Sequence, residues 1–173
     1  LFEDHEPGQV WIEPLRDEDV PEVLAAWPHF LRTILATAGG TLEQLTEGAD
    51  PQFLRQVAEF FDLALRHPAA WRRVARDREG TLTGFTVHLP VCGATFPLFE
   101  RHPAFGPFLT SYFTPEELRS LPADPEHAEI WWLVSVACSD VDLAATRAAL
   151  MRDSLGLFTR GGVYIGITPL DTM

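Results

Sequence analysis

The segment from Glu129 to Thr168 most constrains what this chain can fold into. It opens with an apolar run, Ile130–Val136, in which β-branched and aromatic residues predominate. A helical segment follows from Asp142 to about Phe158, and a second strand-like run covers Val163–Ile167. Runs of this length and composition are typical of strands, and the intervening stretch is long enough for a helix. The order strand, helix, strand therefore predicts an α/β domain.

Length and charge narrow the classes of protein further. The 173 residues, of which 46% are hydrophobic, fit a single domain covering residues 1–173 with a proper core. The formal net charge is −12, and this argues against direct binding of nucleic acid, since phosphate contacts dominate such affinity. All 13 basic residues are Arg and Asn is absent, a bias typical of a GC-rich bacterial genome. The dense basic cluster, residues 72–78, is either a solvated strand and turn or an anion site.

The sequence offers little evidence for a metal site, a disulfide framework or a membrane span. Cys92 and Cys138 are too few for a disulfide framework, and the six histidines lack metal-ligand spacing, so no metal site is predicted. No apolar run approaches the roughly 20 residues of a membrane span. We therefore expect a cytoplasmic protein that does not contact membranes. The start at Leu1 suggests a fragment of a longer protein.

The first half of the chain predicts one strand, two helices and a hairpin. A short strand is expected at Val10–Leu15, and a helix from about Val20 that Pro28 kinks or ends. Apolar residues at helical spacing predict another helix from Pro51 to about His67. Strand-like runs at 71–76 and 82–89 then flank a turn that ends in glycine at position 80, which predicts a hairpin.

This order of elements resembles the Gcn5-related N-acetyltransferase (GNAT) fold. The opening Ile12–Asp19 and the pair Gly84 and Phe85 after the hairpin turn are also similar to that family. The resemblance covers most of the chain and implies an α/β (α+β) domain. Its sheet would be mixed, mostly antiparallel, and flanked by helices.

Two departures from the family pattern stand out. The connection 90–128 is rich in proline and aromatic residues where the family has a short turn, and Thr114–Glu117 has the features of a helix start. The chain also lacks the family's C-terminal strands, because it stops at Met173. The strand at Val163–Ile167 would then be an open edge. We expect this edge to pair with a second copy or with an additional domain of the parent chain.

The resemblance implies where acetyl-CoA would bind. Its pyrophosphate would lie on backbone N–H groups at the start of the helix after the fourth strand, near Val136, Cys138 and Ser139. The corresponding segment, Ala137–Asp142, has no glycine and holds two aspartates. A carboxylate there would cap the helix and repel a phosphate. We therefore expect no cofactor, and acetyl-CoA only if the chain is an enzyme.

Two residues are candidates for a general base that deprotonates an amine. Glu129, at the start of the fourth strand, matches the position of the family's glutamate, and His88 on the hairpin is the alternative. Each also has a plain structural reading, as a polar strand start or as a histidine within a strand. Trp131 and Trp132 should point to opposite faces of their strand, so both are buried or one lines a ligand pocket.

Three functions remain open from the sequence. The first is a non-catalytic GNAT-like module of a bacterial cytoplasmic, regulatory protein that senses a small ligand, dimerises or binds another protein. The second is a divergent, acyl-CoA-dependent N-acetyltransferase acting on an amine. The third is a structural assembly domain. The sequence favours the first function. It does not decide whether the chain is an enzyme, because function resides in sites rather than in folds.

Overall fold

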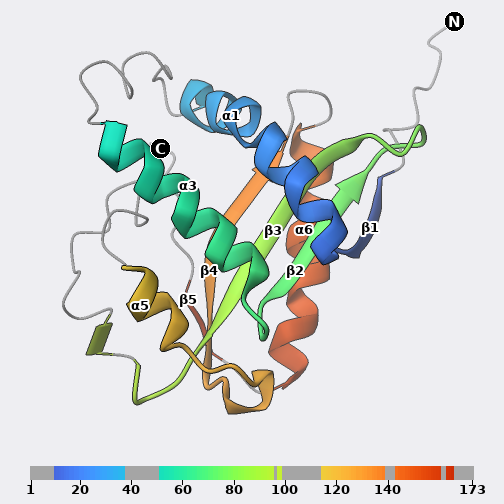
Figure 1. Ribbon diagram of the computed structural model, residues 1–173. Helices are drawn as coiled ribbons and strands as arrows, with labels where there is room; N and C mark the ends of the chain where they lie inside the picture. Colours follow the sequence, from blue (N-terminus) through green and yellow to red (C-terminus); the bar gives the residue numbers. More distant parts are fainter. Residues whose placement is uncertain are drawn as a thin grey trace, which may run out of the picture.

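The computed structural model describes residues 10–37, 51–95, 97–98, 114–138, 143–160 and 163–165. Its centre is one five-stranded sheet in the order β1-β2-β3-β4-β5 (Figure 1). Neighbouring strands are antiparallel from β1 to β4, whereas β4 and β5 are parallel. This arrangement confirms the predicted mixed, mostly antiparallel sheet. The strands are β1 Trp11–Pro14, β2 Trp71–Arg76, β3 Leu82–Val91, β4 Ile130–Cys138 and β5 Val163–Ile165.

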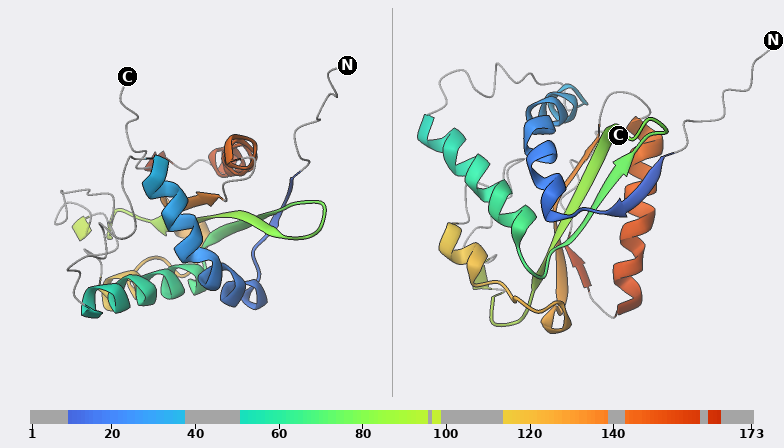
Figure 2. Two further views of the ribbon diagram at one scale, coloured as in Figure 1. Left: turned by 90° about the horizontal axis from the view of Figure 1, so that it is seen from above. Right: turned by 45° about the vertical axis from the view of Figure 1, so that its right-hand side comes forward.

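Helices cover both faces of the sheet. Helices α1 (Val20–Thr37) and α3 (Pro51–Arg66) lie on one face and α6 (Leu143–Ser154) on the other, as the view from above shows (Figure 2). Four short elements complete the described part of the chain: η1 Asp17–Asp19, α5 Pro115–Arg119, η3 Pro125–His127 and η4 Leu155–Arg160. The structure thus has three layers, with the sheet between helices on both of its faces.

Helix α1 does not end at Pro28. An interior proline removes one backbone hydrogen bond and destabilises a helix by about 3 kcal/mol. Here Pro28 is exposed, and Phe30 beyond it is only 1% exposed, with its ring centre 5.6 Å from that of Phe85. The burial of Phe30 therefore holds the second half of α1 against the sheet and offsets the loss.

The core lies mainly between the sheet and helices α1 and α3. Alternate residues of β3, from Phe85 to Val91, point to this face and are buried. Trp132 of β4 is 0% exposed and packs against Phe60 of α3, with 6.0 Å between the ring centres. Leu118 and Leu121, in and just after α5, belong to the same cluster. The connection between β3 and β4 is therefore anchored to the core at its C-terminal end.

That connection begins later than the sequence predicts. We predict it from Pro90, but β3 continues through Pro90 to Val91, which pairs with Ile130. Proline fits there because the pairing of β2 with β3 ends at His88. Beyond that point β3 has β4 as its single neighbour among the described strands, so a missing N–H on the other side breaks no bond between them.

The predicted helix start in this connection is confirmed. Thr114 Oγ1 accepts a hydrogen bond from the Glu117 N–H at 3.2 Å, and the Thr114 N–H donates to Glu117 Oε2 at 2.8 Å. Both bonds of a capping box are therefore present. Pro115 occupies the first helical position, where a missing N–H is tolerated.

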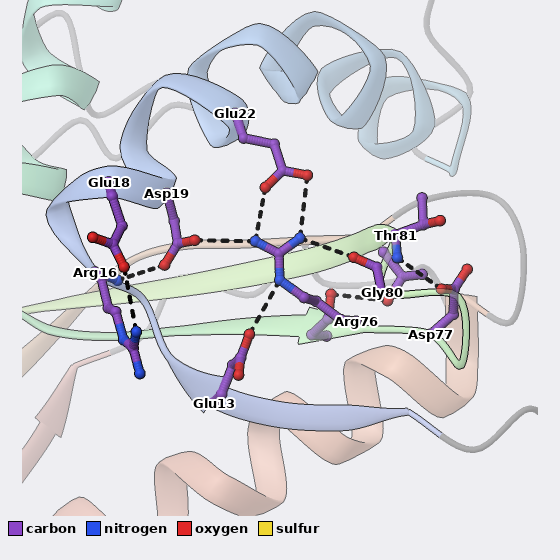
Figure 3. A network of polar contacts seen from close by, with 11 residues as sticks. Glu13, Arg16, Glu18, Asp19, Glu22, Arg76, Asp77, Gly80 and Thr81 are labelled. Atoms are coloured by element: carbon purple, nitrogen blue, oxygen red, sulfur yellow. Dashed lines mark hydrogen bonds and ion pairs between the residues drawn. The ribbon is translucent and has the colours of Figure 1, made fainter.

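Arg76 joins the first helix to the hairpin (Figure 3). Its guanidinium donates to both carboxylate oxygens of Glu22, at 3.2 and 2.7 Å, and to Asp19 Oδ1 at 3.1 Å. It also donates to Glu13 Oε1 and to the Gly80 carbonyl, each at 3.1 Å. The side chain is only 18% exposed. Three carboxylates thus neutralise and hold one arginine.

The other strand arginines are also paired. Arg72 forms an ion pair with Asp17, and Arg73 Nε donates to Asp153 Oδ2 at 3.0 Å. The Arg73 guanidinium also lies 4.1 Å from the centre of the Trp71 ring, in a cation–π contact. These arginines connect β2 to η1 and α6. Three arginines of the basic cluster are therefore paired with the chain's own carboxylates, which argues against an anion site at Arg72, Arg73 and Arg76.

Replacing Arg76 with methionine should lower the free energy of unfolding by about 2 kcal/mol. Breaking a buried ion pair costs about 3–5 kcal/mol, and partial solvent screening of Glu13 and Glu22 reduces that figure. Urea denaturation provides the measurement. The control is Arg16→Met, because the side chain of Arg16 is 73% exposed and pairs with Glu18 at the surface. Equal losses in both variants would show that the Arg76 cluster adds no stability of its own.

Candidate functional site

The C-terminal end of β4 extends further than the sequence predicts. We predict a loop from Ala137, but Ala137 and Cys138 are the last residues of β4 and pair with Phe85 and Gly84. Val136 pairs with Thr86 in the same ladder. Two of the three candidate cofactor residues, Val136 and Cys138, are thus strand residues whose backbone pairs with β3. The third, Ser139, lies outside the described residues.

Helix α6 starts at Leu143, close behind the end of β4. Only residues 139–142 separate the two elements, and two of these four are Asp140 and Asp142. The helix has 12 residues, so its N-terminus carries the positive end of a substantial dipole. An anion bound at this terminus would therefore lie within a few residues of two carboxylates.

A bulge in β4 lies between its two ends. Val87 of β3 pairs with Ser135, but His88 pairs with Leu133, so Val134 is an extra residue in β4. Pairing of β4 with β5 covers Ile130–Trp132, just before this bulge. A bulge bends its strand and increases the local twist. The bulge therefore changes the direction of β4 beyond the segment that pairs with β5.

Glu129 lies at the opposite end of β4. Its N–H donates to the Val91 carbonyl at 3.0 Å, and its exposed side chain lies beside Gly93, where an added Cβ would be 3.5 Å from Oε2. It lines an open depression of about 680 Å³. At about 3.3 Å per residue, Glu129 is about 30 Å of extended strand from Cys138. The remaining lining residues are Cys92, Ala94, Thr95, Ser120, Pro122, Glu126, His127 and Ala128.

Cys92 is a neighbour of Glu129 that the sequence does not indicate. Its Sγ is 3.6 Å from the Thr95 hydroxyl, and this hydrogen bond is the main cause that lowers the pKa of the thiol. Glu129 acts in the opposite direction and raises it. The antiparallel pairing of Val91 with Ile130 brings the two residues together. The exact end of β3 would have revealed this pairing, but strand ends are poorly fixed by sequence patterns.

His88 is buried on the face of the sheet that α6 covers. It is 0% exposed, and its ring centre lies 5.1 Å from that of Trp71 in an edge-to-face contact. Burial lowers the pKa of His88 to about 4, a hydrogen bond with the Trp71 backbone opposes this shift, and Arg73 adds to it. An imidazole without solvent access offers no base to an amine from outside. The structure also separates it from Glu129, because His88 pairs with Leu133.

Solved structures of low sequence similarity share this arrangement. An acetyltransferase of the GNAT family from Brucella melitensis, solved in complex with acetyl-CoA, matches with a TM-score of 0.52, 15% identity, and coverage of 95% of this chain and 79% of its own. A glucosamine N-acetyltransferase region of a fungal multi-domain β-N-acetylglucosaminidase matches with a TM-score of 0.51, 14% identity and coverage of 98% of this chain. This chain has the GNAT fold. It spans only 15% of the fungal protein.

Sequence comparison adds no relative to these structural neighbours. No family model and no curated protein sequence matches the chain. The likeness is therefore one of fold, at identities that do not carry an activity from one protein to another. A third GNAT protein, from Kribbella flavida, has a TM-score of 0.46 and 19% identity over 88% of this chain.

Both tryptophans of β4 are core residues of this chain. Trp131 is 4% exposed and Trp132 is 0% exposed, on opposite faces of the strand. This confirms burial of both indoles, whereas the alternative of a ligand pocket lined by one of them is not supported in the described residues. Among the helices described, none is long and apolar enough to cross a bilayer. The described ranges also hold no cluster of three metal-binding side chains.

Proposed function

We propose that this domain is a non-catalytic GNAT-like module that binds a small ligand or a protein partner and does not transfer acetyl groups. The observation that carries this proposal is the short acidic segment between β4 and α6. Helix α6 begins at Leu143, and Asp140 and Asp142 precede it within three residues. In the GNAT fold this helix start is where a pyrophosphate would need free N–H groups and no negative charge.

The size of the repulsion supports this view. Two unit charges about 4 Å apart interact by about 1 kcal/mol in water and by about 4 kcal/mol at a protein surface. A pyrophosphate beside one or two aspartates would thus lose about 5- to 1,000-fold in affinity. An aspartate that caps the helix would also occupy the N–H groups themselves. The net charge of −12 adds a long-range repulsion of the same sign.

The candidate bases support the proposal less directly. His88 is enclosed between the sheet and α6, and its neutral form is favoured by burial. Glu129 is exposed and lies at the far end of β4 from the α6 start. We infer a regulatory role within a bacterial cytoplasmic protein, with self-association or an additional domain of the parent chain as the context.

The second candidate is a divergent N-acetyltransferase. One observation favours it: Glu129 lines an open depression and is free to accept a proton from a bound amine. In that case Glu129→Gln would abolish release of coenzyme A from acetyl-CoA in the presence of amines. Our proposal instead predicts no such release by the unaltered protein with any amine offered.

Thermal unfolding in the presence of acetyl-CoA tests the proposal. A ligand at about 100 times its Kd stabilises the folded state by about 2.7 kcal/mol, which for a domain of this size is a rise of about 5 to 11 °C in Tm. We expect no rise at millimolar acetyl-CoA. A concentration-dependent rise would instead favour the acetyltransferase.

A further inference from the structure

Helix α6 buries one side against the sheet and also exposes apolar residues. Thr146, Leu150 and Ser154 are buried against the sheet. At about 100° per residue these three positions fall on one side of the helix. Helix α3 differs in degree, since its exposed residues Gln52, Arg55, Glu59 and Arg66 are polar and Ala58 is the one apolar residue described as exposed. The outer side of α6 differs from this pattern.

The outer side of α6 carries an apolar stripe. Ala144, Ala148 and Leu155 are exposed, and Met151 is half-buried. Spaced by four, three and four residues, they fall within about 60° of arc. Leu155, in the first position of η4, is 56% exposed and is one of two large apolar residues so exposed in the described part of the chain. We call these four residues the α6 stripe.

Arginines flank the stripe on both sides. Arg147 and Arg152 are exposed, and at 100° per residue they lie on either side of the apolar positions. No carboxylate among the described residues forms an ion pair with either side chain. The arginines of β2 are paired instead, as Arg73 is with Asp153. In a chain of net charge −12, the α6 stripe is thus an apolar surface with an arginine on each margin, beginning two residues after Asp142.

We propose that the α6 stripe is the docking surface for an acidic amphipathic helix of a partner protein. Apolar residues of that helix would pack on Leu155 and Met151, and its carboxylates would pair with Arg147 and Arg152. Helix-on-helix packing requires such a stripe with complementary charges at its margins. This inference rests on the proposed function, because it names the partner class of a non-catalytic module.

Charge complementarity argues against a second copy as the occupant. If two copies packed through their α6 stripes about a two-fold axis, the same surface would face itself. Arginines at the margins would then meet arginines, and like charges across a contact disfavour association. An acidic helix avoids this repulsion.

Two synthetic helical peptides provide the probe. Both carry leucines at the spacing of the stripe, and their flanking positions are all Glu in one and all Lys in the other. We expect fluorescence anisotropy to show about tenfold tighter binding of the Glu peptide. The global charge of the protein favours the Lys peptide, so this preference would report the local surface. Leu155→Asp should abolish binding, whereas Trp11→Asp, at the other exposed large apolar residue, should preserve it.

Charge reversal gives a second readout, a reversed peptide preference, that a loss of folding would not mimic. The double variant Arg147→Glu/Arg152→Glu should reverse the preference toward the Lys peptide. The control Arg16→Glu/Arg119→Glu changes the net charge equally at two other exposed arginines and should keep the original preference. Tighter binding of the Lys peptide by the unaltered protein would overturn the proposal. So would a dimer in sizing chromatography that Leu155→Asp dissociates. Neither result bears on acetyl-CoA binding, so the proposed function is tested separately.

Discussion

Replacing Trp132 with alanine should lower the free energy of unfolding by about 3 to 5 kcal/mol, the range for truncation of large aromatic core residues. The indole is 0% exposed and packs against Phe60 at the centre of the cluster between sheet and helices. The cavity left behind could not collapse, because β4 is held by β3 on one side and β5 on the other. For a domain of this size the loss corresponds to a fall in Tm of about 6 to 20 °C.

The matched control is Trp11→Ala, at a tryptophan that is 48% exposed on the edge strand β1. Its loss should stay below about 1 kcal/mol, since a half-exposed side chain buries less apolar surface. Urea denaturation of both variants measures the difference. Similar losses at the two positions would contradict the placement of Trp132 in the core.

Acidification should destabilise the fold through His88. Burial lowers its pKa from 6.5 to about 4, so between these values the unfolded chain binds a proton that the folded protein excludes. The stability is therefore fully present above about pH 6.5 and is lost as the pH falls toward 4. A shift of this size corresponds to about 3 kcal/mol.

A comparison of variants isolates this contribution. In His88→Leu, the loss between pH 6.5 and 4 should become smaller, because no group at position 88 can take up a proton. Part of the loss should remain, since burial also lowers the pKa of His67. The control His127→Gln alters a histidine whose side chain is 75% exposed and should leave the profile unchanged. If His88→Leu shows the full pH dependence, the acid sensitivity resides elsewhere.

The order of elements could be predicted because each leaves a local pattern. The hairpin was predictable from the turn that ends in Gly80, whose φ of 79° glycine adopts without strain. The start of α5 followed from its capping box. These features depend on residues close in sequence. The prediction of a helix end at Pro28 and of a strand end before Pro90 failed where distant contacts decide, namely the packing of Phe30 on Phe85 and the early end of β2 pairing.

The candidate site was predictable only in part. The sequence indicates the acidic segment before α6 and the position of Glu129 at the start of β4. It does not indicate that His88 faces α6, because either face of a strand that is buried on both sides looks the same in sequence. The placement of Cys92 and Glu129 in one depression depends on the register of β3 and β4, which the bulge at Val134 shifts.

Calorimetric titration of acetyl-CoA tests the central claim most directly, using the unaltered protein and the variant Asp140→Gly/Asp142→Gly. If the two carboxylates exclude the pyrophosphate, the unaltered protein shows no binding heat at millimolar ligand. The variant should then gain affinity by about 5- to 1,000-fold, in line with the removed repulsion. Micromolar binding by the unaltered protein would contradict the account, because the helix start would then hold a pyrophosphate despite both aspartates.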